Sequence, residues 1–215
     1  MNRKVHLVRH AEGLHNLRDD PTIPDAPLSE RGFDLAEDLG RRFIHDNSDS
    51  VGAMLVSPLR RAIQTSLAAF PRVLGAAHYP VNSGRGVRTG GVTLLLDPDL
   101  QEISSLACNV GSPPRELLEE FPEMGAQIGG LPSRWFEKTG LWSPARAAVA
   151  QRKIRILQRL WDVSEELQSS PDGREDIVVV THEGIILVLV PDAEVPMGAY
   201  RTFTLVKAGT EIVLR

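Results

Sequence analysis

The chain has 215 residues, the size of one domain, and 42% of them are hydrophobic. The 28 Asp and Glu outnumber the 24 Lys and Arg, so the chain lacks the basic excess that is typical of nucleic-acid-binding proteins. The single cysteine excludes an intrachain disulfide and a cysteine-rich metal site, and it is typical of a reducing compartment. The longest apolar run, residues 185–190, is far shorter than the roughly 20 residues of a membrane span. We therefore expect a cytoplasmic protein that does not enter a membrane.

Strands and helices are predicted to alternate along the first half of the chain. Residues 4–8 and 51–56 are short apolar runs that are typical of strands. Between them, Ser29 is predicted to cap a helix with apolar residues at helical spacing. A second helix is expected to begin at Ser57–Pro58, because a capping serine followed by proline favours a helix start. A third strand is predicted over 93–96.

The second half of the chain continues this alternation. In chain order, the expected elements are a short helix over 114–121, a long helix over 145–168, a strand over 176–181, a short helix over 185–190 and a hairpin of 200–206 with 211–214. Strands that alternate with helices predict an α/β protein, a three-layer α/β/α sandwich with a mostly parallel central sheet. We expect a single domain over residues 1–215, with a small cap or loop region around 72–145.

Charged and imidazole side chains follow several of the predicted strands. Ligands of open α/β sheets bind beyond the carboxyl ends of the strands, so these residues are predicted to share one site. They are Arg9 and His10 after the first strand, Arg61 after the second, Glu102 after the third and His182 after the fourth. Folding alone does not require two histidines, two arginines and a carboxylate at one edge of a sheet.

The residue types in this cluster suit binding and transfer of an anionic group. An arginine beside a helix N-terminus, as predicted for Arg61, is typical of a phosphate or carboxylate site. Positive neighbours lower the pKa of an imidazole, which keeps His10 neutral and nucleophilic. Glu102 is a candidate proton donor to a leaving group, and His182 is a candidate hydrogen-bond donor to the same anion.

Four blocks of sequence carry a resemblance to a known family. In chain order they are residues 7–12 (LVRHAE) with Asn16, residues 27–32 (PLSERG), residues 57–65 (SPLRRAIQT) and residues 180–184 (VTHEG). Together they resemble the histidine phosphatase superfamily, which is also called phosphoglycerate mutase-like. The stretch from residues 100–103 to 121–122 is similar to an intracellular fungal branch of that superfamily.

The resemblance implies a two-step phosphoryl transfer that needs no metal and no cofactor. His10 would attack phosphorus and become phosphohistidine. Glu102 would protonate the departing alcohol and then activate water for the second step. The partner implied is a small phosphorylated or otherwise anionic molecule, and the protein would act as a phosphatase on a small metabolite.

The resemblance also implies which residues bind the phosphate. Arg9, Arg61 and His182 would hold its oxygens and stabilise the charge that is redistributed in the transition state. Asn16 would add a further contact, or it would only stabilise a turn. No nucleic acid and no membrane is expected as a partner, and monomer and homodimer both stay open.

Two departures from the family pattern leave other functions open. Ala11 replaces the usual glycine after the first histidine, and Glu183 stands where a small residue often follows the second. A carboxylate at 183 either points away from the pocket or repels a phosphate, and the segment after Val190 is short. An enzyme of specialised metabolism that uses the same groups for acid–base chemistry on an unphosphorylated molecule is therefore an alternative. A phosphoglycerate-type mutase and a non-catalytic binding protein are further alternatives.

Other residues near these motifs have ordinary structural explanations. Ser57 is predicted to be a helix cap, Arg60 to lie in solvent and Cys108 to pack as a small side chain. For His15 the sequence leaves two roles open, in the pocket wall or in loop packing.

Overall fold

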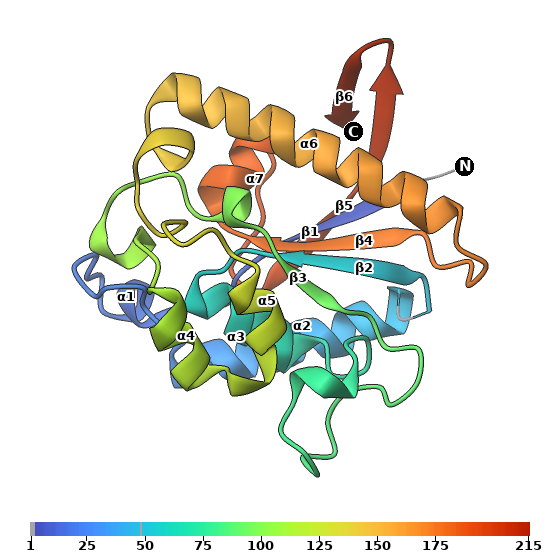
Figure 1. Ribbon diagram of the computed structural model, residues 1–215, viewed down its shortest axis with the longest axis horizontal. Helices are drawn as coiled ribbons and strands as arrows, with labels where there is room; N and C mark the ends of the chain where they lie inside the picture. Colours follow the sequence, from blue (N-terminus) through green and yellow to red (C-terminus); the bar gives the residue numbers. More distant parts are fainter. Residues whose placement is uncertain (1–2, 48) are drawn as a thin grey trace.

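A computed structural model describes residues 3–47 and 49–215. Its helices and strands alternate along the chain (Figure 1). In chain order they are β1 (Lys4–Arg9), α1 (Leu14–Leu17), α2 (Glu30–Asn47), β2 (Val51–Val56), α3 (Arg60–Ala69), β3 (Leu94–Leu96), α4 (Pro114–Glu120), α5 (Gly125–Gly129), α6 (Arg146–Gln168), β4 (Asp176–Thr181), α7 (Glu183–Leu189), β5 (Ala199–Ala208) and β6 (Glu211–Leu214). Every strand and helix that the sequence predicts is present, with shifts of a few residues at some ends.

The strands form one six-stranded sheet in the order β3-β2-β4-β1-β5-β6. β3, β2, β4 and β1 are mutually parallel, whereas β5 pairs antiparallel with β1 and with β6. The register places Val180 of β4 between Val8 of β1 and Val56 of β2. The ends of these three strands therefore lie side by side, and the prediction of an α/β fold with a mostly parallel sheet is confirmed.

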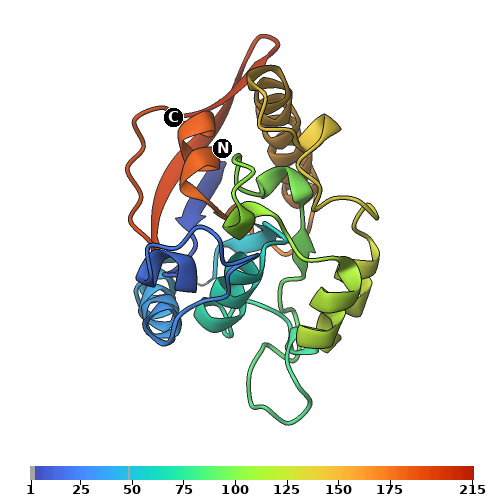
Figure 2. The same ribbon diagram turned by 90° about the vertical axis from the view of Figure 1, so that its left-hand side faces the viewer.

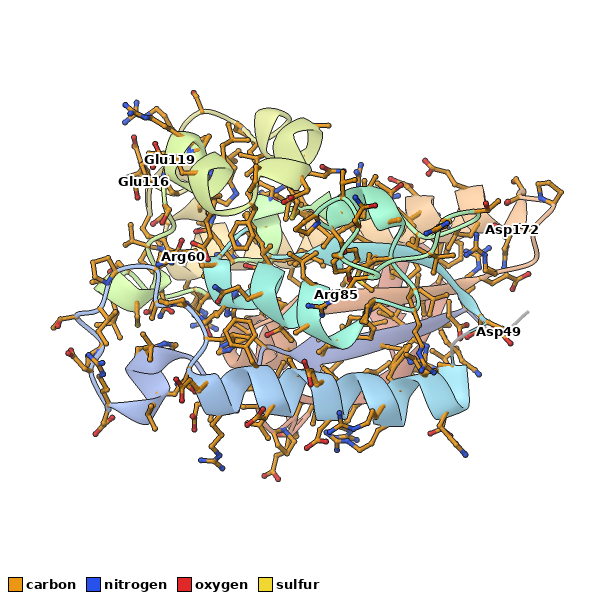
Figure 3. The ribbon with its side chains drawn as sticks, turned by 90° about the horizontal axis from the view of Figure 1, so that it is seen from below. Asp49, Arg60, Arg85, Glu116, Glu119 and Asp172 are labelled. Atoms are coloured by element: carbon orange, nitrogen blue, oxygen red, sulfur yellow. The ribbon has the colours of Figure 1, made fainter. Side chains whose placement is uncertain are left out.

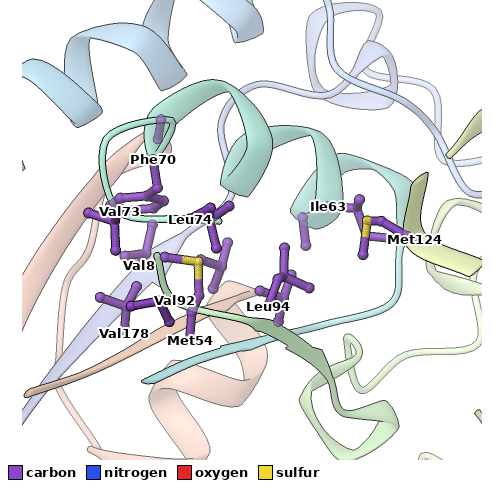
Figure 4. Packing of buried hydrophobic residues seen from close by; sticks show 14 of the residues in the cluster. Val8, Met54, Ile63, Phe70, Val73, Leu74, Val92, Leu94, Met124 and Val178 are labelled. Atoms are coloured by element: carbon purple, nitrogen blue, oxygen red, sulfur yellow. The ribbon is translucent and has the colours of Figure 1, made fainter. Parts of the chain in front are cut away.

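Both faces of the sheet are covered by helices, because β4 and its neighbours carry apolar side chains on both sides. Figure 1 shows α6 and α7 over one face and α2 to α5 over the other. On the α2 to α5 side, Val8, Met54 and Val178 of the sheet pack with Ile63 and Phe70 of the α3 segment (Figure 4). On the other side, Leu7, Leu55 and Val179 belong to a cluster that includes Ile156, Leu160 and Ile185. None of the helices described is long and apolar enough to cross a membrane.

The sequence predicted the start of one helix correctly and the start of another too early. Ser29 Oγ accepts a hydrogen bond of 2.9 Å from the backbone N–H of Gly32, which confirms the predicted cap of α2. The prediction that α3 begins at Ser57–Pro58 is wrong, because α3 begins at Arg60. The backbone N–H of Ser57 still donates to the carbonyl of Val180 on β4, so residue 57 continues the sheet. The Ser57 hydroxyl accepts the backbone N–H of Leu59 at 3.3 Å and is also hydrogen-bonded to His182 Nε2 at 2.8 Å.

The segment predicted as a cap or loop region, 72–145, contains β3, α4, α5 and several 3-10 turns. α5 was not predicted from the sequence, because it is only five residues long and has glycine at both ends. Helices this short form through tertiary packing rather than intrinsic propensity. Met124 and Ile128 join the core cluster on that side of the sheet, so the region is packed against the main body.

Candidate active site

A pocket of about 390 Å³ opens beyond the carboxyl ends of the parallel strands, at the end of the molecule that faces the viewer in Figure 2. Its lining comprises Arg9, His10, His15, Asn16, Asp19, Pro21, Arg61, Glu102, Leu106, Cys108, Asn109, Glu183 and Met197. Five of the six residues expected at the site therefore line one pocket. The sixth, His182, is fully buried and lies behind Arg61.

The Arg61 guanidinium lies between the two imidazoles. Its Nε donates to His10 Nε2 at 3.2 Å, and its Nη2 donates to His182 Nδ1 at 3.1 Å. The two imidazole centroids are 4.9 Å apart. Arg61 projects from the first turn of α3, where the helix N-terminus adds positive potential. The deep end of the pocket thus combines a buried cation with a nitrogen lone pair of His10.

The hydrogen bonds assign the tautomers of both histidines. His10 Nδ1 donates to the carbonyl of Ala11 at 2.7 Å, which leaves Nε2 with a lone pair. His182 accepts from Arg61 at Nδ1, so its Nε2 carries the proton and donates to Ser57 Oγ at 2.8 Å. Neutral imidazoles are the only forms that fit these partners, because an arginine only donates.

Burial and positive charge keep both imidazoles neutral. The pKa of His10 lies well below its ordinary value because of desolvation and the nearby Arg61 guanidinium. The pKa of His182 is lowered well below its usual range by the same two causes, in the same order. A neutral His10 with a free Nε2 lone pair is the form of histidine that acts as a nucleophile.

Glu102 reaches the pocket from the loop after β3. Its Oε1 accepts the backbone N–H of Ile103 at 2.7 Å, and its Oε2 accepts the N–H of Gly184 at 3.2 Å. A Cβ at position 184 would lie 2.1 Å from Glu102 Oε1, so a side chain there would displace the carboxylate from its present position. The glycine of the VTHEG block thus has a packing role next to the carboxylate.

Two basic side chains, Lys138 and Arg152, donate hydrogen bonds to the loop that carries Glu102. Lys138 Nζ donates to the carbonyl of Glu102 and to the side chain of Gln101, each at 2.6 Å. The fully buried Arg152 donates to the carbonyls of Asp99 and Gln101. Burial, followed by repulsion from Arg152, lowers the pKa of Lys138 to about 7. Sequence reasoning missed both residues, because neither lies near a motif.

Arg9 and Asn16 lie at the side of the pocket. Arg9 Nη1 donates to Glu183 Oε1 at 2.9 Å and to the carbonyl of Val195 at 3.4 Å. Asn16 Oδ1 accepts the backbone N–H of Gly13 at 3.1 Å. Asn16 therefore stabilises the turn into α1 and also lines the pocket, so the two roles that the sequence left open coexist.

Asn109 and Ser57 are site residues that the motifs did not single out. Asn109 Oδ1 accepts from Arg61 Nη2 at 2.8 Å, and the carbonyl of Cys108 accepts from Arg61 Nη1 at 2.6 Å. The prediction that Cys108 only packs is incomplete, because this residue also lines the pocket. A signal for Ser57 was available, since it directly follows a predicted strand. The sequence offers no such signal for Asn109, which stands 48 residues from Arg61 in the chain.

The structure settles the positions of His15 and Arg60. His15 lies in the pocket wall, with its ring centroid 6.2 Å from that of His10, and burial lowers its pKa to about 4. The prediction that Arg60 lies in solvent is wrong: its side chain is 29% exposed and Nε pairs with Glu120 of α4 at 2.5 Å. Figure 3 labels Arg60 at the start of α3 below α4. Arg60 thus joins two helices rather than lining the pocket.

Over residues 3–47 and 49–215, His, Cys, Asp and Glu side chains form no group of three or more that is arranged to hold a metal ion.

Comparison with known proteins agrees with this geometry. The model of the histidine phosphatase superfamily (branch 1) matches residues 5–78, which include β1, α2 and α3. A Schizosaccharomyces pombe protein described as a probable phosphatase is 26% identical over 129 residues, which cover 57% of this chain and 51% of the relative. The alignment thus spans about half the length of that relative. An Arabidopsis thaliana phosphoglycerate mutase-like protein is 24% identical over 206 residues, 86% of this chain and 72% of the relative.

The fold is shared with a solved phosphatase. A mycobacterial glucosyl-3-phosphoglycerate phosphatase in complex with vanadate (VO3) superimposes with a TM-score of 0.60 at 18% identity, over 99% of this chain and 96% of that one. The matched family segment contributes His10 and Arg61 to the pocket, and the full-length fold similarity also covers the segments that carry Glu102 and His182. Residues 5–78 of the chain are therefore similar to the histidine phosphatase superfamily (branch 1), and the whole chain has a phosphoglycerate mutase-like α/β fold.

Proposed function

We propose that the protein is a metal-independent phosphatase that hydrolyses a small phosphorylated metabolite through a phosphohistidine on His10. One observation carries the proposal. The buried Arg61 guanidinium is hydrogen-bonded to uncharged acceptors and lies against the unprotonated Nε2 of His10. A buried cation that lacks a hydrogen-bonded anion favours binding of one, and the nucleophile is already in place beside it.

In the first step, His10 Nε2 attacks phosphorus and the bond between phosphorus and the alcohol oxygen breaks. Glu102 gives its proton to that oxygen, so the product leaves as a neutral alcohol. His10 can act at once, because its Nδ1 proton is held by the carbonyl of Ala11 and Nε2 needs no deprotonation. The Arg61 Nε–H that now bonds to Nε2 turns to a phosphoryl oxygen.

In the second step, water replaces His10 on phosphorus. The Glu102 carboxylate takes a proton from the water, the new P–O bond forms and the P–N bond breaks. Neutral His10 and inorganic phosphate result, and Glu102 is protonated again for the next cycle. The same side chain serves as acid and then as base because the two steps are chemically the reverse of each other.

Charge on the phosphoryl group is stabilised by Arg9, Asn16, Arg61 and His182. Donors that are fixed before the reaction stabilise developing charge without reorganisation. Arg61 is held by Asn109 and by the Cys108 carbonyl, which supports such pre-organisation. His182 lies behind Arg61, on the side away from the pocket. It orients Arg61 through its hydrogen bond with Nη2, and it contacts the phosphate when Arg61 turns toward the ligand.

The match of residues 5–78 to the family model supports this reaction class, and the names of the relatives support a phosphorylated substrate. The placement in an intracellular fungal branch stays a prediction, because the yeast and the plant relative match at nearly the same identity.

The first test is hydrolysis of p-nitrophenyl phosphate in EDTA between pH 4 and 8, with wild type and His10→Ala. We expect turnover in wild type without added metal and none in the variant. The melting temperature of His10→Ala should show an intact fold. Acid quenching during turnover should trap phosphohistidine on wild type only.

Two results would contradict the proposal. Turnover that persists in His10→Ala would exclude His10 as the nucleophile. An absence of turnover in folded wild type would favour the alternative, acid–base chemistry on an unphosphorylated metabolite.

A further inference from the structure

The pocket has a deep end and an exposed mouth. At the deep end, His10 and Arg61 are 4% and 1% exposed. The exposed members of the lining are Asp19, Pro21, Leu106 and Glu183. A phosphoryl group that binds against His10 and Arg61 therefore leaves the alcohol part of its ester at the mouth.

Glu183 turns toward this pocket rather than away from it. It is the first residue of α7 and directly follows His182. Its carboxylate lines the pocket and pairs with Arg9 Nη1 at 2.9 Å. The Glu183 side chain is 57% exposed and that of Arg9 is 18% exposed, so the carboxylate is on the solvent side of the pair. The charge at 183 thus lies where the alcohol of a substrate would be.

The pair leaves Arg9 able to bind phosphate at the same time. A guanidinium has five N–H donors, and the contact with Glu183 uses Nη1. Arg9 Nε is buried and has no hydrogen-bond partner among the described residues. Other donors of Arg9 therefore remain for a phosphoryl oxygen. The Glu183 carboxylate can stay in place when a substrate binds.

We propose that Glu183 determines which phosphomonoesters the pocket accepts. Esters with a neutral or amino-bearing alcohol are accepted, and esters whose alcohol part carries a carboxylate are disfavoured. Like charges brought together at a binding surface reject a ligand, and the other charged residue of the exposed mouth, Asp19, is also acidic. This inference rests on the proposed phosphatase function and adds the class of substrate.

The test compares three esters of similar size: glycerol 3-phosphate, O-phosphoethanolamine and 3-phosphoglycerate. Phosphate release is measured at pH 7 and low ionic strength for wild type, Glu183→Gln and Glu211→Gln. Glutamine at 183 keeps a hydrogen-bond acceptor for Arg9 and removes the charge. Glu211→Gln is the matched control, because Glu211 pairs with Ala208 at the end of β5 that is distant from Ala199 and Arg9.

For wild type we expect kcat/KM for 3-phosphoglycerate to be at least about tenfold below that for glycerol 3-phosphate, the effect of a single unfavourable charge contact. Glu183→Gln should raise kcat/KM for 3-phosphoglycerate about tenfold, lower it for O-phosphoethanolamine and change it less than about threefold for glycerol 3-phosphate. Glu211→Gln should match wild type. Added salt should shrink the differences, because the carboxylate is half exposed.

The outcomes separate the inference from the proposed function. If Glu183→Gln leaves the ratio between the esters unchanged, or if wild type already treats the three alike, the inference is overturned, while turnover of p-nitrophenyl phosphate keeps the proposed function. If folded wild type turns over p-nitrophenyl phosphate but none of the three esters, only the inference is overturned. If it turns over neither these esters nor p-nitrophenyl phosphate, both are overturned. Glu183→Ser also removes the charge, so it should change the ratio of kcat/KM between the esters in the same direction. This second variant shows that the effect does not come from the glutamine side chain itself.

Discussion

At the residue scale, one arginine organises the candidate site. Arg61 donates to two imidazoles, one side-chain amide and one backbone carbonyl. These contacts fix the orientation of its fork and assign the tautomer of His182. They also place positive charge against both histidines, which lowers the pKa of each in addition to the effect of burial. Arg61 therefore acts together with burial to keep the nucleophile neutral, and it defines the position of the anion site.

The role of Glu102 is testable through the leaving group. Glu102→Gln should slow hydrolysis of alkyl phosphates by about 10²–10⁴-fold, the usual contribution of a general acid. Hydrolysis of p-nitrophenyl phosphate should suffer much less in the first step, because p-nitrophenolate leaves without a proton. The measurement is the single-turnover rate of phosphohistidine formation for esters whose alcohols differ in pKa. Equal slowing for all esters would remove Glu102 as the acid.

At the scale of the elements, contact between helices depends on small residues. α2 and α3 pack closely on the same face of the sheet, and Gly40 of α2 lies against the last residue of α3. A Cβ at position 40 would lie 2.0 Å from the carbonyl oxygen of Ala69, which is backbone and cannot turn away. Because α3 presents Arg61, this contact also bears on the geometry of the site.

Gly40→Ala should lower the free energy of unfolding by about 1–3 kcal/mol, the usual cost of overpacking. Urea denaturation measures the change. Gly129→Ala is the matched control: Gly129 is helical, and a Cβ there would meet nothing within 4 Å. The control should leave stability unchanged or raise it by up to about 1 kcal/mol. Equal effects of the two substitutions would contradict the close-contact explanation.

At the scale of the whole molecule, the site costs stability under acidic conditions. His10, His15 and His182 all have pKa values below the ordinary value of 6.5, with burial as the largest cause for each. The unfolded chain therefore binds more protons than the folded protein as the pH falls below 6.5. These three histidines therefore lower the free energy of unfolding in that direction.

We expect wild type to be less stable at pH 4.5 than at pH 6.5, as measured by urea denaturation at both values. His15→Gln should weaken this dependence, because the lowering of its pKa from 6.5 to about 4 places most of its contribution in this range. His45→Gln is the control: His45 is exposed, and its pKa is raised by Asp46 rather than lowered. If His15→Gln and wild type lose stability in parallel, the lowered pKa of His15 is wrong.

The sequence by itself determined the elements, their alternation and the edge of the sheet where the site would lie. Apolar periodicity and caps such as Ser29 depend on residues that are close in sequence, so they can be recognised from the sequence alone. The position of Arg9 and His10 at the end of a strand was predictable because that strand is itself a local apolar pattern. The start of α3 was predicted too early, because the backbone of Ser57 still pairs with Val180 on β4 and continues the sheet.

Only the tertiary structure decided how the side chains meet. Arg61 contacts His10 and His182 across 51 and 121 positions of the chain, and Arg9 contacts Glu183 across 174. Such distances in sequence leave no periodic trace, because the contacts depend on strand order and on how the loops close over the sheet. The same holds for Asn109 and Lys138, which come from loops of the 72–145 region. The direction of the Glu183 carboxylate, open in the sequence, was decided by the packing of α7 beside β1.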